Sequence, residues 1–446
     1  MKFFRSGWFH LLLTSWALMN RLPAQVGPLV SPVTAQTVSS DPQQKNEPTV
    51  PSDTNGAATA GDLVTATKWG FVIPGVVNLE ELSGTGVLFG AAASQGYGWL
   101  QGGTSTNNEE GYLSVVQPYA ALFQTGHRHK FLLEYSPTVD LYNRHQWDGN
   151  VLQRGSIKGF NLLSERWSWN YSIFGTYGLE YLRELSGFAV GEYPGWLTFS
   201  VPSDTRLLAS ASTGLSFRRK PRQEFSFILN DAYSAVIQGP HYDVGSARVQ
   251  ATDYFGRNSN WYTYAQAHRY TDQPGCTRIG AGGGFAWNAS SSTTLSLEAG
   301  PEYGSGRCVE RLTGTFSGTL AQHLFSPRTV LYLRATRDLA EPYLLQNSWT
   351  DVFSAKLWQK TSQSTNFDAG AAYVRGSSLP GESVSRYRGF LAFSEFRWRL
   401  SNSFDFVGSY RYFKRDLTNP GFDDRHSWVF GSIVWHPLFR GMGRSN

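Results

Sequence analysis

Apolar and polar residues alternate along most of this chain, in segments of about ten to fourteen residues that are separated by breaks. In WSWNYSIFGTYGLEY, odd positions from 167 to 181 are mostly aromatic or aliphatic, and even positions are mostly polar or small. Successive side chains of a β-strand point to opposite faces, so the pattern is typical of a strand with one apolar face. KFLLEYSPTVDLY at 130–142 and SFDFVGSYRYFK at 403–414 repeat it. The sequence therefore predicts an all-β fold.

Composition agrees with this prediction and excludes a bundle of membrane helices. Among 446 residues there are 46 glycines, 22 tyrosines and 15 tryptophans, a balance that favours strands and tight turns. Only 16% of the residues are charged, yet the chain is hydrophilic on average, with a mean hydropathy of −0.32. A chain of this hydropathy does not cross a membrane through several continuous apolar helices.

The breaks between the alternating segments are short and long in turn between residues 85 and 435. Short breaks lie at 126–129, 164–165, 258–260, 288–292, 326–328, 361–365 and 401–403. Most breaks between them are longer: 102–111, 143–151, 183–204, 340–348, 377–384 and 416–424. Short turns on one rim and long loops on the other are expected of a transmembrane antiparallel β-barrel, whose strand number is even and whose short turns face the periplasm. We predict about eighteen strands, with sixteen as the alternative, and both chain ends on the short-turn rim.

The first 84 residues differ from the rest. Lys2 and Arg5 precede an apolar run at 7–19, and small residues near Ala24 or Ala35 offer a cleavage site, so residues 1–24 are predicted to be a signal peptide. The alternative is a membrane anchor, although the run is shorter than the roughly 20 residues that a spanning helix needs. Residues 25–84 are predicted to be a flexible periplasmic leader rich in Pro, Thr and Gln. The apolar run at 71–77 within it either starts the folded part or enters the interior.

From residue 85 to 446, the alternating segments, the rhythm of breaks and the aromatic last strand resemble a bacterial outer-membrane β-barrel of the porin-like family. The last strand lies within HSWVFGSIVWHPLF at 426–439, and such barrels typically end on an aromatic-rich strand that the barrel assembly machinery recognises. This sequence departs from that pattern because RGMGRSN follows Phe439. The resemblance implies location in the outer membrane after export through the periplasm, in contact with lipid and lipopolysaccharide.

With the apolar face of each strand toward lipid, the charged residues of the polar face point inward. A lipid-facing Arg or Lys near the midplane costs about 2–4 kcal/mol, so inward placement is favoured. The candidates for lining a pore are Glu134, Asp140, Glu180, Arg248, Glu298, Arg311, Arg334, Asp405 and Arg411. The long loop at 185–204 is a candidate constriction, with an external cap as the alternative.

Charge gives a weak indication of the solute. The chain has a net charge of +5, of which +4 remains after residue 76. This excess allows a slight anion preference, but basic residues near lipopolysaccharide phosphates account for it as well. The basic residues are dispersed, and the sequence does not indicate nucleic-acid binding.

The two cysteines flank a pair of neighbouring strands. Cys276 precedes the segment at 279–287 and Cys308 follows the segment at 293–300, so both lie on the long-loop rim. A disulfide is chemically permitted after export and is expected to tie the two loops together. Two unpaired thiols remain the alternative, because spacing does not fix the Cα separation.

Motifs that carry chemistry are few, and we expect neither an enzyme nor a bound cofactor or metal. GAGGGF at 280–285 lacks the third glycine of a dinucleotide loop and lies inside a strand. His127 and His129 lack an evident third metal ligand. None of the nine histidines is followed two residues later by serine, the pair that outer-membrane phospholipases use. His268 is interpreted as an interior or rim residue.

The function predicted by these features is a channel for passive or loosely selective passage of small hydrophilic solutes, in which inward polar residues and loops set the specificity. The alternative is a non-conducting barrel that takes part in surface polysaccharide export or serves as a structural or adhesion platform. Both monomeric and homo-oligomeric assembly are compatible with the sequence.

Overall fold

The structure is a computed structural model of the full chain, and it describes fourteen segments of it. These segments are 84–102, 109–141, 151–179, 205–236, 241–255, 258–270, 275–290, 292–306, 308, 312–324, 328–339, 349–377, 386–417 and 422–435. The predicted signal peptide, the leader up to residue 83 and the candidate constriction at 185–204 lie outside the described residues. None of the described residues belongs to a helix long and apolar enough to cross a membrane.

The described residues form nineteen strands. Their bounds are β1 (Gly84–Gly102), β2 (Glu109–Thr125), β3 (His129–Tyr135), β4 (Thr138–Asp140), β5 (Val151–Leu162), β6 (Trp167–Leu179), β7 (Thr205–Lys220), β8 (Gln223–Val236), β9 (His241–Phe255), β10 (Ser259–Tyr270), β11 (Cys276–Ser290), β12 (Thr293–Gly306), β13 (Leu312–His323), β14 (Thr329–Leu339), β15 (Trp349–Lys360), β16 (Thr365–Ser377), β17 (Arg386–Arg399), β18 (Phe404–Leu417) and β19 (Phe422–Trp435).

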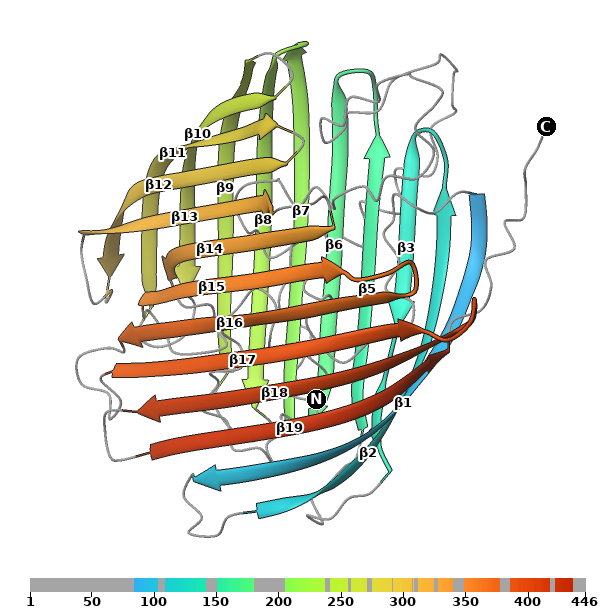
Figure 1. Cartoon of the computed structure of the whole chain (residues 1–446). Coiled ribbons are helices and arrows are strands. Elements are labelled where there is room, and N and C mark those ends of the chain that lie inside the picture. Colours follow the sequence, from blue (N-terminus) through green and yellow to red (C-terminus); the bar gives the residue numbers. More distant parts are fainter. Residues whose placement is uncertain are drawn as a thin grey trace, which may run out of the picture. The chain divides into compact units, whose positions relative to one another are not determined.

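These strands form one closed antiparallel sheet in which neighbours in sequence are neighbours in space (Figure 1). The sheet closes where β19 pairs with β1, from Ala91 opposite Trp435 to Gly102 opposite Asp424. β3 and β4 occupy one position, because both pair with β2 on one side and β5 on the other. The sheet is therefore an eighteen-position barrel with one interrupted strand, and the predicted fold and strand number are confirmed.

The interruption between β3 and β4 lies at Ser136 and Pro137. Proline has no backbone N–H and cannot donate to a ladder, which explains why regular pairing stops here. The Ser136 N–H still donates to the Arg154 carbonyl at 3.0 Å, so the strand continues in the same direction. Just beyond the interruption, the side-chain amide of Gln117 on β2 donates a hydrogen bond to the Thr138 hydroxyl on β4 at 2.9 Å.

Short connections alternate with longer ones, as the rhythm of breaks predicts. One short connection, Pro221 and Arg222 between β7 and β8, was not among the predicted breaks because basic residues flank it instead of Ser and Asn. One predicted loop is wrong in length: pairing of β18 with β19 continues to Leu417 opposite Phe422, inside the predicted break at 416–424. Charged side chains at the ends of these strands interrupt the alternation between apolar and polar residues. The sequence pattern therefore does not locate these strand ends.

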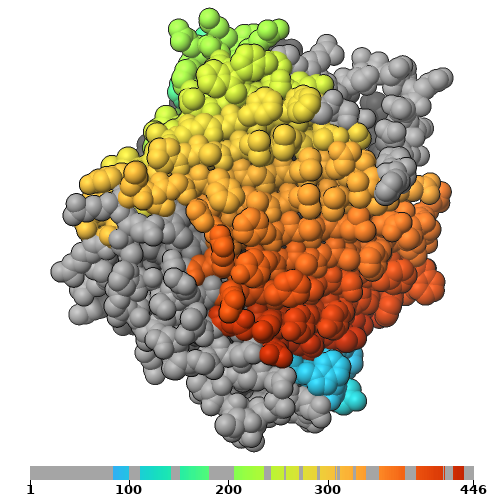
Figure 2. All heavy atoms as spheres, turned by 60° about the vertical axis from the view of Figure 1, so that its left-hand side comes forward, coloured from blue at the N-terminus to red at the C-terminus, as the bar shows by residue number. Residues whose placement is uncertain are grey.

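One face of the strands carries most of the exposed large apolar side chains. They include Val87, Phe89, Leu122, Leu133, Tyr177, Phe225, Phe227, Trp261, Phe285, Leu297, Leu333, Phe353, Tyr373, Phe390, Phe396, Trp398, Tyr410, Val429 and Ile433. Register partners share a face, which makes this set continuous from strand to strand. Figure 2 shows this outward face over the yellow to red strands. The alternating positions face inward.

Where the sheet closes, aromatic side chains of β19 point inward against glycines of β1. Ring atoms of Phe430 and Trp428 occupy the positions that a Cβ atom would take at Gly96 and Gly98. The same glycines lie opposite Phe430 and Trp428 in the register. Only residues without a side chain allow this close approach. The aromatic residues of β19 therefore lie on both faces of the sheet, with Trp435 on the outward face and Phe430 on the inward face.

The inward face is not polar throughout, which corrects the interpretation of a uniformly polar interior. Leu88, Tyr119, Ala121, Phe123 and Leu132, on β1, β2 and β3, form a buried apolar cluster. A second cluster joins Leu113, Val115, Leu152, Leu179 and Phe430. Strands with apolar residues on both faces do not alternate cleanly, so their inner residues were hidden in the sequence pattern. Apolar packing thus stabilises the interior beside the seam.

Candidate functional site

The charged residues of the inward face are gathered into pairs that link two or more strands, and these pairs form the candidate functional site. Strands such as β5, β9, β12 and β18 contribute charged positions to the inward face, whereas β1 and β6 carry no charged residue. A charge away from bulk water is costly unless a partner of opposite sign lies near it. The arrangement of partners therefore determines what field a solute inside the barrel would meet.

The most extensive pair joins Arg248 of β9 to Glu298 of β12. Arg248 donates through Nη1 to Glu298 Oε1 at 2.9 Å and through Nη2 to Oε2 at 3.0 Å. Its Nε and Nη2 atoms also donate to Gln250 Oε1 at 3.2 and 2.8 Å. Both charged side chains are almost fully buried. A two-point contact of this kind fixes the orientation of the guanidinium as well as its position.

Two tyrosines of β10 hold this pair between them. The guanidinium carbon of Arg248 lies 3.9 Å from the ring centre of Tyr264 and 5.8 Å from that of Tyr262. The Tyr262 hydroxyl donates to Glu298 Oε2 at 2.8 Å. Cation–π contact and hydrogen bonding thus stabilise the pair on different sides.

Glycines of β11 make room for these tyrosines, and this is the role of the GAGGGF segment. β11 lies between β10 and β12, so a side chain on β11 would separate Tyr262 from Glu298. Ring atoms of Tyr264 and Tyr262 occupy the Cβ positions of Gly282 and Gly284. These two glycines therefore lie on the inward face, whereas Trp287 of the same strand is on the outward face. The signal available in the sequence was glycine at alternate positions of one strand.

A second inward cluster surrounds Glu134 of β3. Its Oε1 accepts from Tyr119 at 3.1 Å and its Oε2 accepts from Ser156 at 2.7 Å. Lys158 Nζ lies 3.4 Å from Oε2. The tyrosine comes from β2, whereas the serine and lysine come from β5, so this carboxylate links three neighbouring strands. Glu134 was predicted from the alternation, whereas Lys158 was not, because it precedes a glycine in a weakly alternating segment.

A third cluster links β15, β16, β17 and β18. Lys356 Nζ lies 3.0 Å from Asp368 Oδ1, and Arg397 Nη2 lies 3.6 Å from Glu395 Oε1. Arg411 is buried and interacts electrostatically with Glu395. Of these residues only Arg411 was predicted.

Near the long-loop rim, Glu302 of β12 is the centre of a fourth group. Gln266 donates to its Oε1 at 2.6 Å, and His268 Nε2 lies 3.7 Å from the same oxygen. Arg278 of β11 is fully buried nearby in the electrostatic field of His268. His268 faces inward at the rim, in agreement with its predicted place.

The remaining predicted lining residues are distributed around the sheet. Asp140 and Asp405 are buried on inward positions. Arg334 also takes an inward position, opposite Thr319 and Ser354. Glu180 and Arg311 lie outside the described residues. Of the predicted charges, Glu134, Arg411 and the pair of Arg248 and Glu298 therefore lie in three separate clusters.

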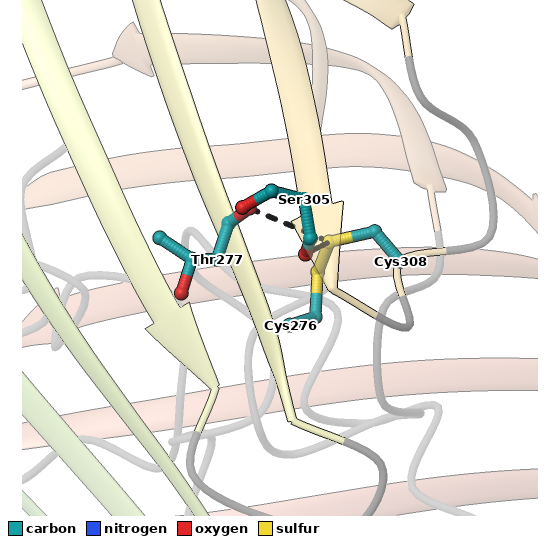
Figure 3. Close-up of a disulfide and its surroundings, with 4 residues drawn as sticks. All are labelled: Cys276, Thr277, Ser305 and Cys308. Carbon is teal, nitrogen blue, oxygen red and sulfur yellow. Dashed lines mark hydrogen bonds between the residues drawn. A yellow bond between two sulfur atoms is a disulfide. The ribbon is translucent and has the colours of Figure 1, made fainter.

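A disulfide joins Cys276 and Cys308 at the long-loop rim, with their Cα atoms 5.0 Å apart (Figure 3). Cys276 begins β11, and Cys308 follows the end of β12. The hydroxyl of Ser305 donates to the Thr277 carbonyl at 3.2 Å beside the bridge. The disulfide thus fastens the outer end of this strand pair beyond the last pair of the register, Cys276 opposite Gly306.

The described residues contain no group of three or more His, Cys, Asp or Glu side chains that could hold a metal ion. His127 and His129 both lie at the turn between β2 and β3, where Gly126 N–H donates to the His129 carbonyl at 2.7 Å. Both imidazoles are exposed. The pair thus stays a turn feature in the described part of the chain.

Comparison with known proteins gives matches among solved structures only. No protein-family model matches the chain, and no curated protein sequence matches it. OccK2 (OpdF) of Pseudomonas aeruginosa is similar with a TM-score of 0.45 at 11% identity, over 80% of this chain and 100% of the other. A BenF-like porin of Pseudomonas fluorescens Pf-5 has a TM-score of 0.44 at 10% identity, over 79% and 99%. The ferric citrate transporter FecA has 0.40 at 11%, over 75% and 60%. Similarities of this size identify neither a family nor a solute.

Proposed function

We propose that this chain forms an outer-membrane channel for small hydrophilic solutes. The observation that carries the proposal is the division of one closed sheet into two chemically different faces. Exposed large apolar side chains cover the outward face, and charged pairs such as Arg248 with Glu298 lie on the inward face. A solvent-exposed surface of this kind would cause aggregation in water, whereas lipid is its natural environment.

Eighteen positions make a barrel too wide for side chains alone to fill. The electric field of the inward charges then acts on water and solute in the lumen, and the pairing of these charges decides selectivity. Glu134 with Lys158, Arg248 with Glu298, and Lys356 with Asp368 each cancel locally. A wall of balanced pairs attracts neither sign strongly, so we infer a loosely selective passage with polar solutes preferred over apolar ones.

The proposed location follows from the same faces. Export through the periplasm, insertion by the barrel assembly machinery through β19, and contact with lipid and lipopolysaccharide on the outward face belong to this proposal. The chain is proposed to act without catalysis. A homo-oligomer is compatible with the exposed outward face but is not required for the proposed passage.

The test is conductance of the refolded full-length protein in a planar lipid bilayer, with a salt gradient across it. Refolding is first checked by the change in gel mobility on heating that distinguishes folded barrels. Stable current steps and a reversal potential near zero are expected, because the inward charges are paired. A folded, heat-modifiable protein that gives no steps would contradict the channel and favour a non-conducting platform with binding loops.

A further inference from the structure

A row of charged residues crosses β14 to β18 on the outward face, close to the long-loop rim. The register places Arg337 opposite Asp351, Asp351 opposite Arg375, Arg375 opposite Arg388, and Arg388 opposite Asp416. Each lies within two residues of the end of its strand. These strands are orange to red in Figure 2, on the face that otherwise carries apolar side chains. We call Arg337, Asp351, Arg375 and Arg388 the rim cluster.

Asp351 holds two of the arginines in place. Its Oδ1 accepts from Arg337 Nε at 2.5 Å, and its Oδ2 accepts from Arg337 Nη2 and Arg375 Nε at 2.8 Å each. The Asp351 side chain is 7% exposed, whereas those of Arg337 and Arg375 are 41% and 56% exposed. One buried carboxylate therefore orients two guanidinium groups that are themselves partly exposed on the outward face.

Arg388 extends the cluster and leaves it with an excess of positive charge. Its side chain is 68% exposed, and its Nε lies 3.7 Å from Asp416 Oδ2. Asp416 is itself 3.2 Å from Lys414 Nζ, so this carboxylate is shared between two cations. Arg425 lies on the same face of β19, opposite Lys414. The acidic side chains described in this row are Asp351 and Asp416. Its basic side chains are three arginines, and Lys414 lies beside Asp416, so positive charge is in excess.

Aromatic residues lie directly below the cluster. Phe353, Tyr373 and Phe390 follow two positions deeper on β15, β16 and β17, and each is about two-fifths exposed on the outward face. Aromatic belts mark the boundary between the hydrocarbon and the headgroups of a membrane. Two residues of a strand span roughly 6–7 Å, which puts the guanidinium groups at the depth of lipid headgroups.

We propose that the rim cluster binds the phosphate of a lipid in the leaflet on the long-loop side. Oriented arginines match phosphate oxygens through two-point hydrogen bonds, and a lipid can place its chains against the aromatic residues below. The cluster selects a headgroup of net negative charge over a zwitterionic one through its excess positive charge. This inference rests on the proposed membrane location and is independent of whether the barrel conducts.

The experiment measures binding of lipid A, a phosphorylated glycolipid, to the delipidated full-length protein in detergent by native mass spectrometry. R375Q/R388Q removes the two most exposed guanidinium groups and leaves the Arg337 and Asp351 pair intact. At about fivefold for each basic residue near a lipid surface, we expect the double variant to bind roughly 25-fold more weakly. R269Q is the matched control, because Arg269 is an exposed outward arginine one residue from the same rim on β10. It should bind within twofold of the wild type.

Three results would overturn the proposal: equal binding by R375Q/R388Q, an equal loss in R269Q, or no preference of the wild type for lipid A over phosphatidylcholine. Inorganic phosphate alone is expected to compete poorly, and tight binding of it at the same arginines would overturn the assignment to a lipid. Folding of each variant is checked by heat-dependent gel mobility. A failure of lipid binding would not contradict the proposed channel, and an absence of conductance would not contradict lipid binding. The two proposals are therefore tested independently.

Discussion

The ring of Phe430 on β19 occupies the space in which a Cβ atom of Gly96 on β1 would lie. The two residues are opposite each other where the first and last strands meet. We expect G96A to weaken closure of the sheet, because even one methyl group forces the phenylalanine out of its position. Overpacking of this kind costs about 1–3 kcal/mol of unfolding free energy.

Urea unfolding followed by heat-dependent gel mobility measures this effect. G431A is the control, since a Cβ atom at Gly431 meets its nearest neighbour at an ordinary 3.8 Å. Gly431 lies next to Phe430 on β19, and G431A should lower the unfolding free energy by much less than G96A. Equal losses in the two variants would mean that glycine matters at the seam for backbone freedom and not for contact with Phe430.

Replacing one member of the Arg248 and Glu298 pair should shift ion selectivity in opposite directions. E298Q leaves Arg248 without its carboxylate and favours anions, whereas R248Q leaves Glu298 and favours cations. The measurement is the reversal potential in a salt gradient. E165Q, at an exposed turn between β5 and β6, is the control and should leave the reversal potential unchanged. Shifts of the same sign in E298Q and R248Q would show that altered packing and not charge controls the current.

The same pair also allows a double-mutant cycle of stability. Removing one partner of a buried ion pair costs about 3–5 kcal/mol, because the other charge is left uncompensated. We therefore expect R248Q/E298Q to lose much less unfolding free energy than the sum of the two single variants. Additive losses would indicate that the two side chains are stabilised by Tyr262, Tyr264 and Gln250 independently of each other.

Neighbouring leucines on opposite faces of β3 provide a test of the apolar interior. Leu132 is fully buried inward, whereas Leu133 is 39% exposed outward. L132A creates a cavity in the inner cluster and should lower the unfolding free energy by about 2–5 kcal/mol. L133A, measured by the same urea titration in detergent, should cost less because the surrounding detergent fills the space. A larger loss in L133A would contradict an apolar core on the inward side.

The disulfide gives a further stability prediction. C276S/C308S removes a bridge between residues 32 positions apart, and bridges of such length contribute about 2–4 kcal/mol by restricting the unfolded chain. We expect a lower thermal midpoint with unchanged single-channel conductance, since the bridge lies beyond the strand ladder at the rim. A reducing agent should lower the midpoint of the wild type but not that of the serine variant. If the reductant acts equally on both, the bridge does not stabilise the fold.

Outward faces and strand number could be predicted from sequence because apolar residues recur at every second position along most strands. The inner face could be predicted only in part. Arg248 and Glu298 stand between clear apolar neighbours, but the partners that join them were not visible. Tyr262 and Tyr264 are aromatic residues on the inward face, and their place depends on glycines of the next strand. Which side chains meet across three strands is set by register, and no local pattern records it.

Strand ends were the other limit of the sequence pattern. Charges of the rim cluster lie on the outward face, where alternation predicts apolar residues, and they therefore resembled loop. Lys158, Lys356 and Glu395 lie on the inward face and were missed because polar and apolar residues do not alternate regularly around them. Each of these charges has a partner of opposite sign: Glu134 for Lys158, Asp368 for Lys356 and Arg397 for Glu395. The first two partners lie on another strand, and Arg397 lies two positions away on the same strand.

The meeting of β1 with β19 also constrains the order in which the molecule assembles. Ser432 donates to Ser94 at 2.8 Å across 338 positions of sequence, so this contact requires nearly the whole chain to be delivered first. Until then both β1 and β18 present unpaired backbone edges, which are prone to pair with other chains. Contacts between such distant residues form slowly. Closure of the sheet therefore waits until the fourteen residues of β19 are available to pair with β1.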